Sequence, residues 1–438
     1  MRRGSSYSYS VIRRPDRRIS ALVLLLCSCT QVPAPGPVPS DEPVAFAVDA
    51  GTTKGAAPIT SLKALAQQDF SVSAWYTPQG ETFEADGAHS IKYIGNHRFG
   101  YVTSNLASLT DDADFINAWQ GVNSHSATGA VIANPVYWPL DGTLTFFCYA
   151  PYRADAAVTP APSPDTRDIV LTDPVTDDAV RSRLPGYLIG SPLIRYTPAA
   201  SVRDQVDFLA ARPILDADRH DDGGRFGLDL AHRLTQVKFS FNYDGYLPDP
   251  EFACVTSIEV RNVVSSAYLY FAEPTPYVMA CRWSTESSLY DPFTTSMPLP
   301  TASYRLTDEE AGGARELIPS NVTSSHIPER NSANDNHLSV CTNDGILYLL
   351  PQELSDDAEL EVGYVIAEQH GVPKVTDVLT VKLRTSSLTA WPAGKQVRYL
   401  LTLNIPNHQL SGISAQLSDW EDAGNTHAPE PLLPHTNP

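Results

Sequence analysis

The sequence lacks the short motifs that mark many enzyme active sites. Its 438 residues contain no GxSxG nucleophile elbow, no HExxH zinc motif, no GxGxxG fingerprint and no Walker loop. The eleven histidines are scattered, without an HxH or i, i+4 pair that would indicate a zinc site. We therefore predict no catalytic residue, no cofactor and no resident metal, and we expect a protein that is not an enzyme.

One acidic stretch is the best candidate for a metal site. Asp216, Asp218 and Asp222 could present oxygen atoms to calcium, but no glutamate stands where an EF-hand loop needs its last ligand. The simpler interpretation is a solvated loop between domains. The sequence favours that second interpretation.

Long apolar runs and basic residues are also scarce. After the N-terminal region, no segment approaches the roughly 20 apolar residues of a transmembrane helix. Without residues 1–28, the chain has 25 lysines and arginines against 49 aspartates and glutamates, a net charge of −24. Such a surface repels phosphate backbones, so nucleic acid is excluded as a partner.

The first 29 residues have the parts of an export signal. A basic cluster that ends at Arg18 is followed by a short apolar stretch, residues 19–26. Leu26, Cys27, Ser28 and Cys29 then match a lipobox. We predict a signal peptide over residues 1–28, cleavage between Ser28 and Cys29, and a lipid on Cys29. An ordinary signal peptide with an incidental cysteine is the alternative.

The next residues predict a tether. Residues 30–43 are rich in proline and contain no lysine or arginine, which favours an extended, unfolded segment. We assign residues 29–50 to this lipidated tether and a first strand. The rest of the chain would then be attached to a membrane by lipid and not embedded in it.

Four cysteines follow Cys29, and none forms a CxxC pair: Cys148, Cys254, Cys281 and Cys341. Cys148 lies in an apolar run and is predicted to be a small buried hydrophobic residue. An exported protein can form disulfides. A bond between Cys254 and Cys281 is one option, and the sequence leaves the pairing open.

The body of the chain shows the period-two alternation of half-buried strands. The clearest examples are residues 237–243, 360–366, 379–383, 397–405 and 413–417. Thirty-six prolines and many Asp-Gly turns leave room only for short helices, at 61–67 and 111–119. We predict an all-β protein with two tandem antiparallel β-sandwiches, at 51–212 and 226–421. Residues 213–225 would be the linker and 422–438 a disordered tail.

A set of short motifs occurs in one order along most of residues 29–421. After the lipobox they are residues 44–48, 53–59, 70–75, 137–147, 149–151, 205–211, 230–239, 349–352, 391–395 and 419–420. In this set the chain resembles the fimbrillin family, the surface lipoproteins and pilins of Bacteroidetes. The resemblance implies transthyretin-like sandwiches, an outer-membrane or fimbrial location, and other fimbrillin-type subunits as partners.

The resemblance also implies assembly by strand exchange. In polymerising members, proteolysis after a basic residue removes the first strand, and a strand of another subunit fills the groove. Here Val44, Phe46 and Val48 would fill the groove, and Lys54 would be the processing site. No lysine or arginine stands between Cys29 and Thr53, so an arginine-specific protease has no early target. The first strand therefore either leaves by cleavage at Lys54 or stays in place.

Retention of the strand favours an anchor or accessory pilus subunit, or a solitary adhesin with a host or bacterial surface ligand. A lipid-anchored glycan-binding protein is the alternative, because tryptophans can stack on sugar rings. The positions of Trp75, Trp283 and Trp391 discriminate between the two. An exposed coplanar row would favour glycan binding, and burial would favour the structural role.

Overall fold

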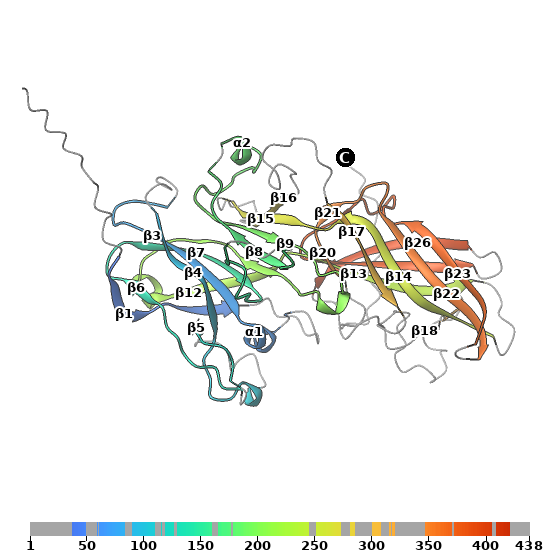
Figure 1. Ribbon diagram of the computed structural model, residues 1–438, viewed down its shortest axis with the longest axis horizontal. Coiled ribbons are helices and arrows are strands. Elements are labelled where there is room, and N and C mark those ends of the chain that lie inside the picture. Colours follow the sequence, from blue (N-terminus) through green and yellow to red (C-terminus); the bar gives the residue numbers. More distant parts are fainter. Residues whose placement is uncertain are drawn as a thin grey trace, which may run out of the picture. The chain divides into compact units, whose positions relative to one another are not determined.

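The computed structural model describes residues 37–49, 59, 61–83, 90–109, 115, 119–126, 129–159, 165–176, 178–244, 251–272, 281–284, 300–307, 315–316, 318–319, 347–369, 372–404 and 409–420. All of them lie in one compact unit, Pro37–Pro438. The structure is almost entirely β, as the alternation predicts (Figure 1). Within the described residues, no helix has the length and apolarity to span a bilayer.

An eight-stranded sheet forms the N-terminal half and closes on itself. Seven strands form the ring, because the last of them, β7, pairs with both β3 and β10, and β11 extends the sheet from β7. In spatial order the strands are β10 (Leu209–Ala211), β12 (Arg225–His232), β2 (Ala45–Asp49), β5 (Trp119–Gly121), β4 (Ile91–Tyr101), β3 (Phe70–Thr77), β7 (Thr143–Ala150) and β11 (Ile214–Ala217).

This closed sheet surrounds an apolar core to which nearly every one of its strands contributes. Phe70, Phe99, Phe146 and Leu230 are all buried in it. Helix α1 (Leu62–Gln68) packs Leu65 into the same core and begins at Ser61, whose hydroxyl accepts the amide of Ala64. The helix predicted at 61–67 is thus confirmed, whereas the one predicted at 111–119 falls largely outside the described residues.

The predicted linker, residues 213–225, lies inside this sheet. Ile214–Ala217 is strand β11, and Arg225 already begins β12. Only the polar residues between these two strands form a connection, and they include a 3-10 turn at Asp221–Gly224. In β12, Phe226, Leu228 and Leu230 are buried at alternate positions, so this strand belongs to the N-terminal core.

The C-terminal half is a sandwich of two five-stranded sheets. One sheet contains β13 (Thr235–Asp244), β19 (Ile318–Pro319), β20 (Leu347–Leu349), β25 (Lys395–Asn404) and β26 (Gln409–Asp419). The other contains β14 (Phe252–Val264), β17 (Thr301–Thr307), β18 (Arg315–Glu316), β22 (Glu359–Gln369) and β23 (Val372–Lys382). Their inner faces share one core, in which Phe239 stacks on Tyr399 with ring centroids 5.7 Å apart.

Most pairings are antiparallel, but two long ones are parallel. Strand β2 runs parallel to β12, and β13 runs parallel to β25 over ten residue pairs. The sequence predicted antiparallel sandwiches because period-two alternation shows that one strand face is buried. It carries no information on the direction of the neighbouring strand.

Strands from both halves of the chain meet in a four-stranded sheet. Its order is β16 (Cys281–Ser284), β15 (Ala267–Phe271), β9 (Leu193–Tyr196) and β8 (Ile169–Thr172). A further core lies against it and includes Trp75, Phe147, Phe271 and Trp420. The two halves are therefore joined by paired strands and shared core residues.

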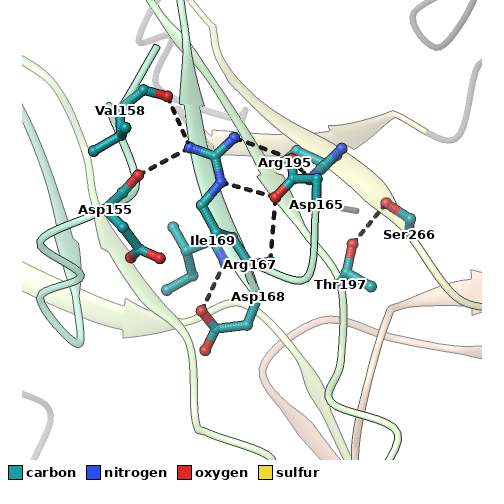
Figure 2. A network of polar contacts seen from close by, with 9 residues as sticks. All are labelled: Asp155, Val158, Asp165, Arg167, Asp168, Ile169, Arg195, Thr197 and Ser266. Atoms are coloured by element: carbon teal, nitrogen blue, oxygen red, sulfur yellow. Dashed lines mark hydrogen bonds and ion pairs between the residues drawn. The ribbon is translucent and has the colours of Figure 1, made fainter. Parts of the chain in front are cut away.

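A charged network fixes the loop that precedes β8 (Figure 2). The guanidinium of Arg167 donates to both carboxylate oxygens of Asp165, at 2.8 and 3.0 Å, and to the backbone carbonyls of Asp155 and Val158. Arg195 on β9 donates to the same carboxylate at 2.8 Å. The two arginines hold the pKa of Asp165 well below its usual range.

Smaller elements complete the fold. A two-stranded sheet pairs β1 (Pro39–Pro43) with β6 (Tyr137–Pro139), and another pairs β21 (Gln352–Glu353) with β24 (Ala390–Trp391). Short helical turns are Leu106–Ser108, α2 (Asp178–Arg181) and Val202–Asp204. The prediction that residues 30–43 are unfolded is thus wrong for residues 39–43, which form strand β1. A proline-rich strand can still pair at a sheet edge.

Candidate functional site

Strand β2 is the segment that the sequence analysis singled out as removable. It lies between β12 and β5 in the closed sheet. Five consecutive residues pair in parallel with β12, from Ala45 opposite Arg225 to Asp49 opposite Asp229. On its other side only two residues pair with β5, Ala45 opposite Gln120 and Phe46 opposite Trp119. Strand β2 therefore closes the ring between the longer strand β12 and the shorter strand β5.

The three side chains predicted to fill a groove all lie in the core. Val44 and Phe46 are 0% and 1% exposed, and Val48 is 7% exposed. Phe46 packs edge-on against Phe99 and Phe146, with ring centroids 5.5 and 5.3 Å apart. The segment is thus bound by apolar packing as well as by its backbone.

The chain that enters β2 is paired as well. The amide of Val44 donates to the carbonyl of Val136 at 2.8 Å, and β1 pairs with β6 on the same side. Trp138 on β6 is 1% exposed and packs against Phe146 and Phe226. Loss of β1 together with β2 would therefore uncover the backbone of β6 as well as the neighbours of β2.

A buried carboxylate binds the chain again after the strand. Asp207 accepts the amide of Ile59 at 3.0 Å, and its other oxygen lies 3.1 Å from Nδ1 of His232. Because a carboxylate only accepts, Nδ1 is the donor in this contact. The ring of His232 stacks on Trp420, with centroids 4.5 Å apart. The amide of Ile59 is therefore held by a hydrogen bond in which β2 takes no part.

A second buried carboxylate, Asp69, supports the sheet beside β5. It ends helix α1 with a positive φ of 56°, accepts Nε of Arg98 at 2.5 Å and lies 2.9 Å from Nε2 of His125. Burial raises the pKa of the Asp69 carboxyl. No sequence pattern predicts this cluster, because its members are 27 to 56 residues apart and match no motif.

The remaining predicted sites lie outside the described residues: Ser28, Cys29 and Lys54. Cys148 is a free, buried cysteine, and burial raises the pKa of its thiol. The side chains of Cys254, Cys281 and Cys341 are outside the described set, so their pairing stays open.

The tryptophans that could have bound sugar form no exposed row. Trp75 is 6% and Trp391 is 1% exposed, and Trp283 is partly buried with its indole N–H donated to the carbonyl of Arg233 at 2.6 Å. The other three tryptophans of the chain are also buried: Trp119, Trp138 and Trp420. These positions favour the structural role over glycan binding.

Two aspartates of the acidic stretch considered as a calcium site, Asp216 and Asp218, accept hydrogen bonds within the protein. The carboxylate of Asp216 accepts the amide of Phe83 at 3.0 Å and the hydroxyl of Thr143 at 3.3 Å. Asp218 accepts the amide of His220 at 2.8 Å. In the part of the chain that the structure describes, no three metal-binding side chains gather. Asp216 thus fixes the loop at residue 83 to strand β11.

The family model for fimbrillin-like proteins matches residues 67–420. The chain belongs to the fimbrillin-like family. The match spans both halves of this fimbrillin-like chain and begins after β2. The resemblance to the fimbrillin family seen in the sequence is confirmed.

One of two similar solved structures supports the same fold. A fimbrial protein from Bacteroides vulgatus is 16% identical, with a TM-score of 0.51, over 86% of this chain and 99% of that protein. A proposed cell adhesion protein from Bacteroides uniformis is 13% identical, with a TM-score of 0.41, over 87% and 100% of the two chains. At such identities the likeness concerns the fold alone. A comparison with curated protein sequences gave no significant match.

Proposed function

We propose that this fimbrillin-like chain is a lipid-anchored surface protein, an anchor or accessory pilus subunit or an adhesin, whose strand β2 can be replaced by a strand of another subunit. The observation that carries the proposal is the position of β2. It is one short strand in a closed sheet, and its inward side chains Phe46 and Val48 lie in the core together with Val44 just before it.

Removal of β2 has a defined physical consequence. Burial of three apolar side chains contributes roughly 1.5–3 kcal/mol for each one. Excision of β2 would expose the core residues that these side chains cover. It would also leave β12 and β5 with unpaired backbone groups along the gap. Unpaired strand edges favour pairing with another strand, so the product should take up a strand from a second molecule.

Two features favour an anchored over a processed protein. The first arginine after the predicted signal is Arg98, in the middle of β4, and its Nε is bonded to the buried Asp69. Cleavage there would cut the closed sheet itself. Lys54 is then the only basic residue between Cys29 and α1, so an arginine-specific protease would leave β2 in place.

The test is limited digestion of the soluble mature chain with a lysine-specific protease, followed by size-exclusion chromatography. Uncut protein should be monomeric, and protein cut at Lys54 should oligomerise. A Lys54→Ala variant is the matched control and should stay monomeric under the same digestion. A cut product that remains monomeric with an unchanged Tm would refute strand exchange.

A peptide experiment sharpens the result. A synthetic peptide of residues 43–49 should bind the cut protein and prevent its oligomerisation. The same peptide with Phe46→Ser should not do so, because the ring that packs between Phe99 and Phe146 is missing. Equal activity of both peptides would show that the groove does not select for the β2 sequence.

A further inference from the structure

An apolar surface patch surrounds the two-stranded sheet at the start of the described chain. Four of its residues are large and exposed: Val38 (59%), Ile91 (43%), Tyr137 (39%) and Leu140 (51%). We define these four as the β1–β6 patch. Within the described residues, most aliphatic side chains of this size lie inside the cores, so a cluster of exposed ones indicates a contact surface.

Backbone and hydroxyl contacts hold the patch together. The amide of Leu140 donates to the carbonyl of Val38 at 2.8 Å, which places these two residues side by side at the end of the β1–β6 pair. The hydroxyl of Tyr93, two residues after Ile91 on β4, donates to the carbonyl of Tyr137 at 2.8 Å. Ile91 also pairs with Tyr76, whose hydroxyl donates to Asp141 beside Leu140.

The position of the patch along the chain identifies its partner. Val38 is nine residues after Cys29. Nine residues span at most about 30 Å even when fully extended. If Cys29 carries the lipid, as the proposed function requires, Val38 at the edge of the patch cannot lie farther than this from the bilayer surface. Aliphatic side chains beside a tyrosine are suited to the boundary between lipid headgroups and acyl chains.

We propose that the β1–β6 patch docks on the lipid surface beside the anchor and orients the protein on the membrane. The charges around it set the type of lipid. Asp41, Asp141 and Lys92 are exposed and Glu42 is half-buried, so the carboxylates here outnumber the single lysine, which lies over the ring of Trp75 at 5.8 Å. This acidic rim favours a zwitterionic over an anionic surface.

The experiment uses the full lipidated chain in phosphatidylethanolamine vesicles. A photoreactive benzoylphenylalanine replaces Leu140, and in a matched control it replaces Val378 on β23, which is 52% exposed. Both proteins should fractionate with vesicles through Cys29. After illumination, lipid adducts should be at least several-fold more abundant at position 140, and added phosphatidylglycerol should lower their yield.

The outcomes separate this inference from the anchor on which it rests. If neither protein fractionates with vesicles, the lipid anchor has failed. If both fractionate but position 140 gives no more lipid adduct than position 378, the anchor stands and the docking surface is refuted. A crosslink from position 140 to a second copy of the chain in place of lipid would also refute it. In a Val38→Ser, Ile91→Ser variant the adduct yield at 140 should fall while fractionation stays unchanged.

Discussion

The carboxylate of Asp207 accepts a hydrogen bond from the backbone amide of Ile59, 148 residues earlier in the chain. Ile59 itself is 0% exposed, and Asp207 is also in contact with His232. This contact lies just after the segment that contains Lys54 and just before helix α1. It therefore separates the chain into a part that cleavage could release and a part that would remain bound.

We expect Asp207→Ala to loosen the chain at Ile59. Loss of the carboxylate leaves a buried amide without its acceptor and should cost about 1–3 kcal/mol in the free energy of unfolding. Chemical denaturation with hydrogen exchange at Ile59 measures both effects. Asp204→Ala, at an exposed position, is the control and should change little. Unchanged exchange at Ile59 would contradict the role given to Asp207.

Phe46→Ala should be strongly destabilising although it lies near the start of the chain. Phe46 is 1% exposed and packs against three other phenylalanines, and large-to-small changes at such sites cost roughly 3–5 kcal/mol. Ala47→Ser, on the half-buried opposite side of the strand, should cost far less. The measurement is the denaturation midpoint. Similar midpoints for the two variants would mean that β2 contributes little to the fold.

Replacement of Cys29 tests the anchor. Cys29→Ala should abolish lipid labelling and either release the protein from membranes or block its maturation, since the tether has no other apolar anchor. Cys27→Ala, two residues earlier, keeps a small residue before the cleavage site and should label normally. Membrane fractionation and metabolic lipid labelling give the result. A Cys29→Ala protein that stays in the outer membrane with full label would refute the lipobox assignment.

Asp165→Asn should reduce stability in a pH-dependent way. The pKa of Asp165 is held below its unfolded value by Arg167 and Arg195, so its ionised form stabilises the folded state. That contribution is fully present above the unfolded pKa, near 4, and is lost as the pH falls toward the folded pKa. The deficit of the variant, about 1.5–3 kcal/mol at neutral pH, should therefore shrink in strong acid.

Thermal or chemical unfolding between pH 7 and pH 2 tests this expectation. Asp155→Asn is the control, because only the backbone carbonyl of Asp155 accepts Arg167 and its side chain is exposed. A deficit that remains constant with pH would show that the charge of Asp165 is not the cause.

Much of the fold follows from residue patterns that act over short distances. The alternation at 237–243 and 397–405 predicted strands that the structure contains as β13 and β25. The Asp141–Gly142 pair predicted a turn, and Gly142 has a φ of +71°, at which a Cβ would contact the carbonyl of Thr77. The apolar alternation at Val44, Phe46 and Val48 likewise indicated the face that is buried.

Other features depend on contacts between residues far apart in the chain. The polar residues after Ala217 suggested a linker between domains, but they connect β11 and β12, two strands of one sheet. This is evident only from the pairing of β11 with β7 and of β12 with β2. The clusters around Asp69 and Asp207 join residues that no local pattern relates. Strand direction in the parallel β2–β12 pair is also set by such distant contacts.

The parallel pairing of β2 with β12 affects the order in which the fold can form. Ala45 pairs with Arg225, so the first strand of the closed sheet must wait until about 180 more residues are available before its main partner exists. Contacts of such high sequence separation form slowly, because the entropy of closing the loop is lost before the pairing stabilises it. Phe46 can meet Phe70, Phe99 and Phe146 before this point, but the backbone of β2 lacks its longest pairing until β12 is present. If the strand exchange proposed above operates, the interval before β12 pairs with β2 is the one in which a neighbour's strand could take the place of β2.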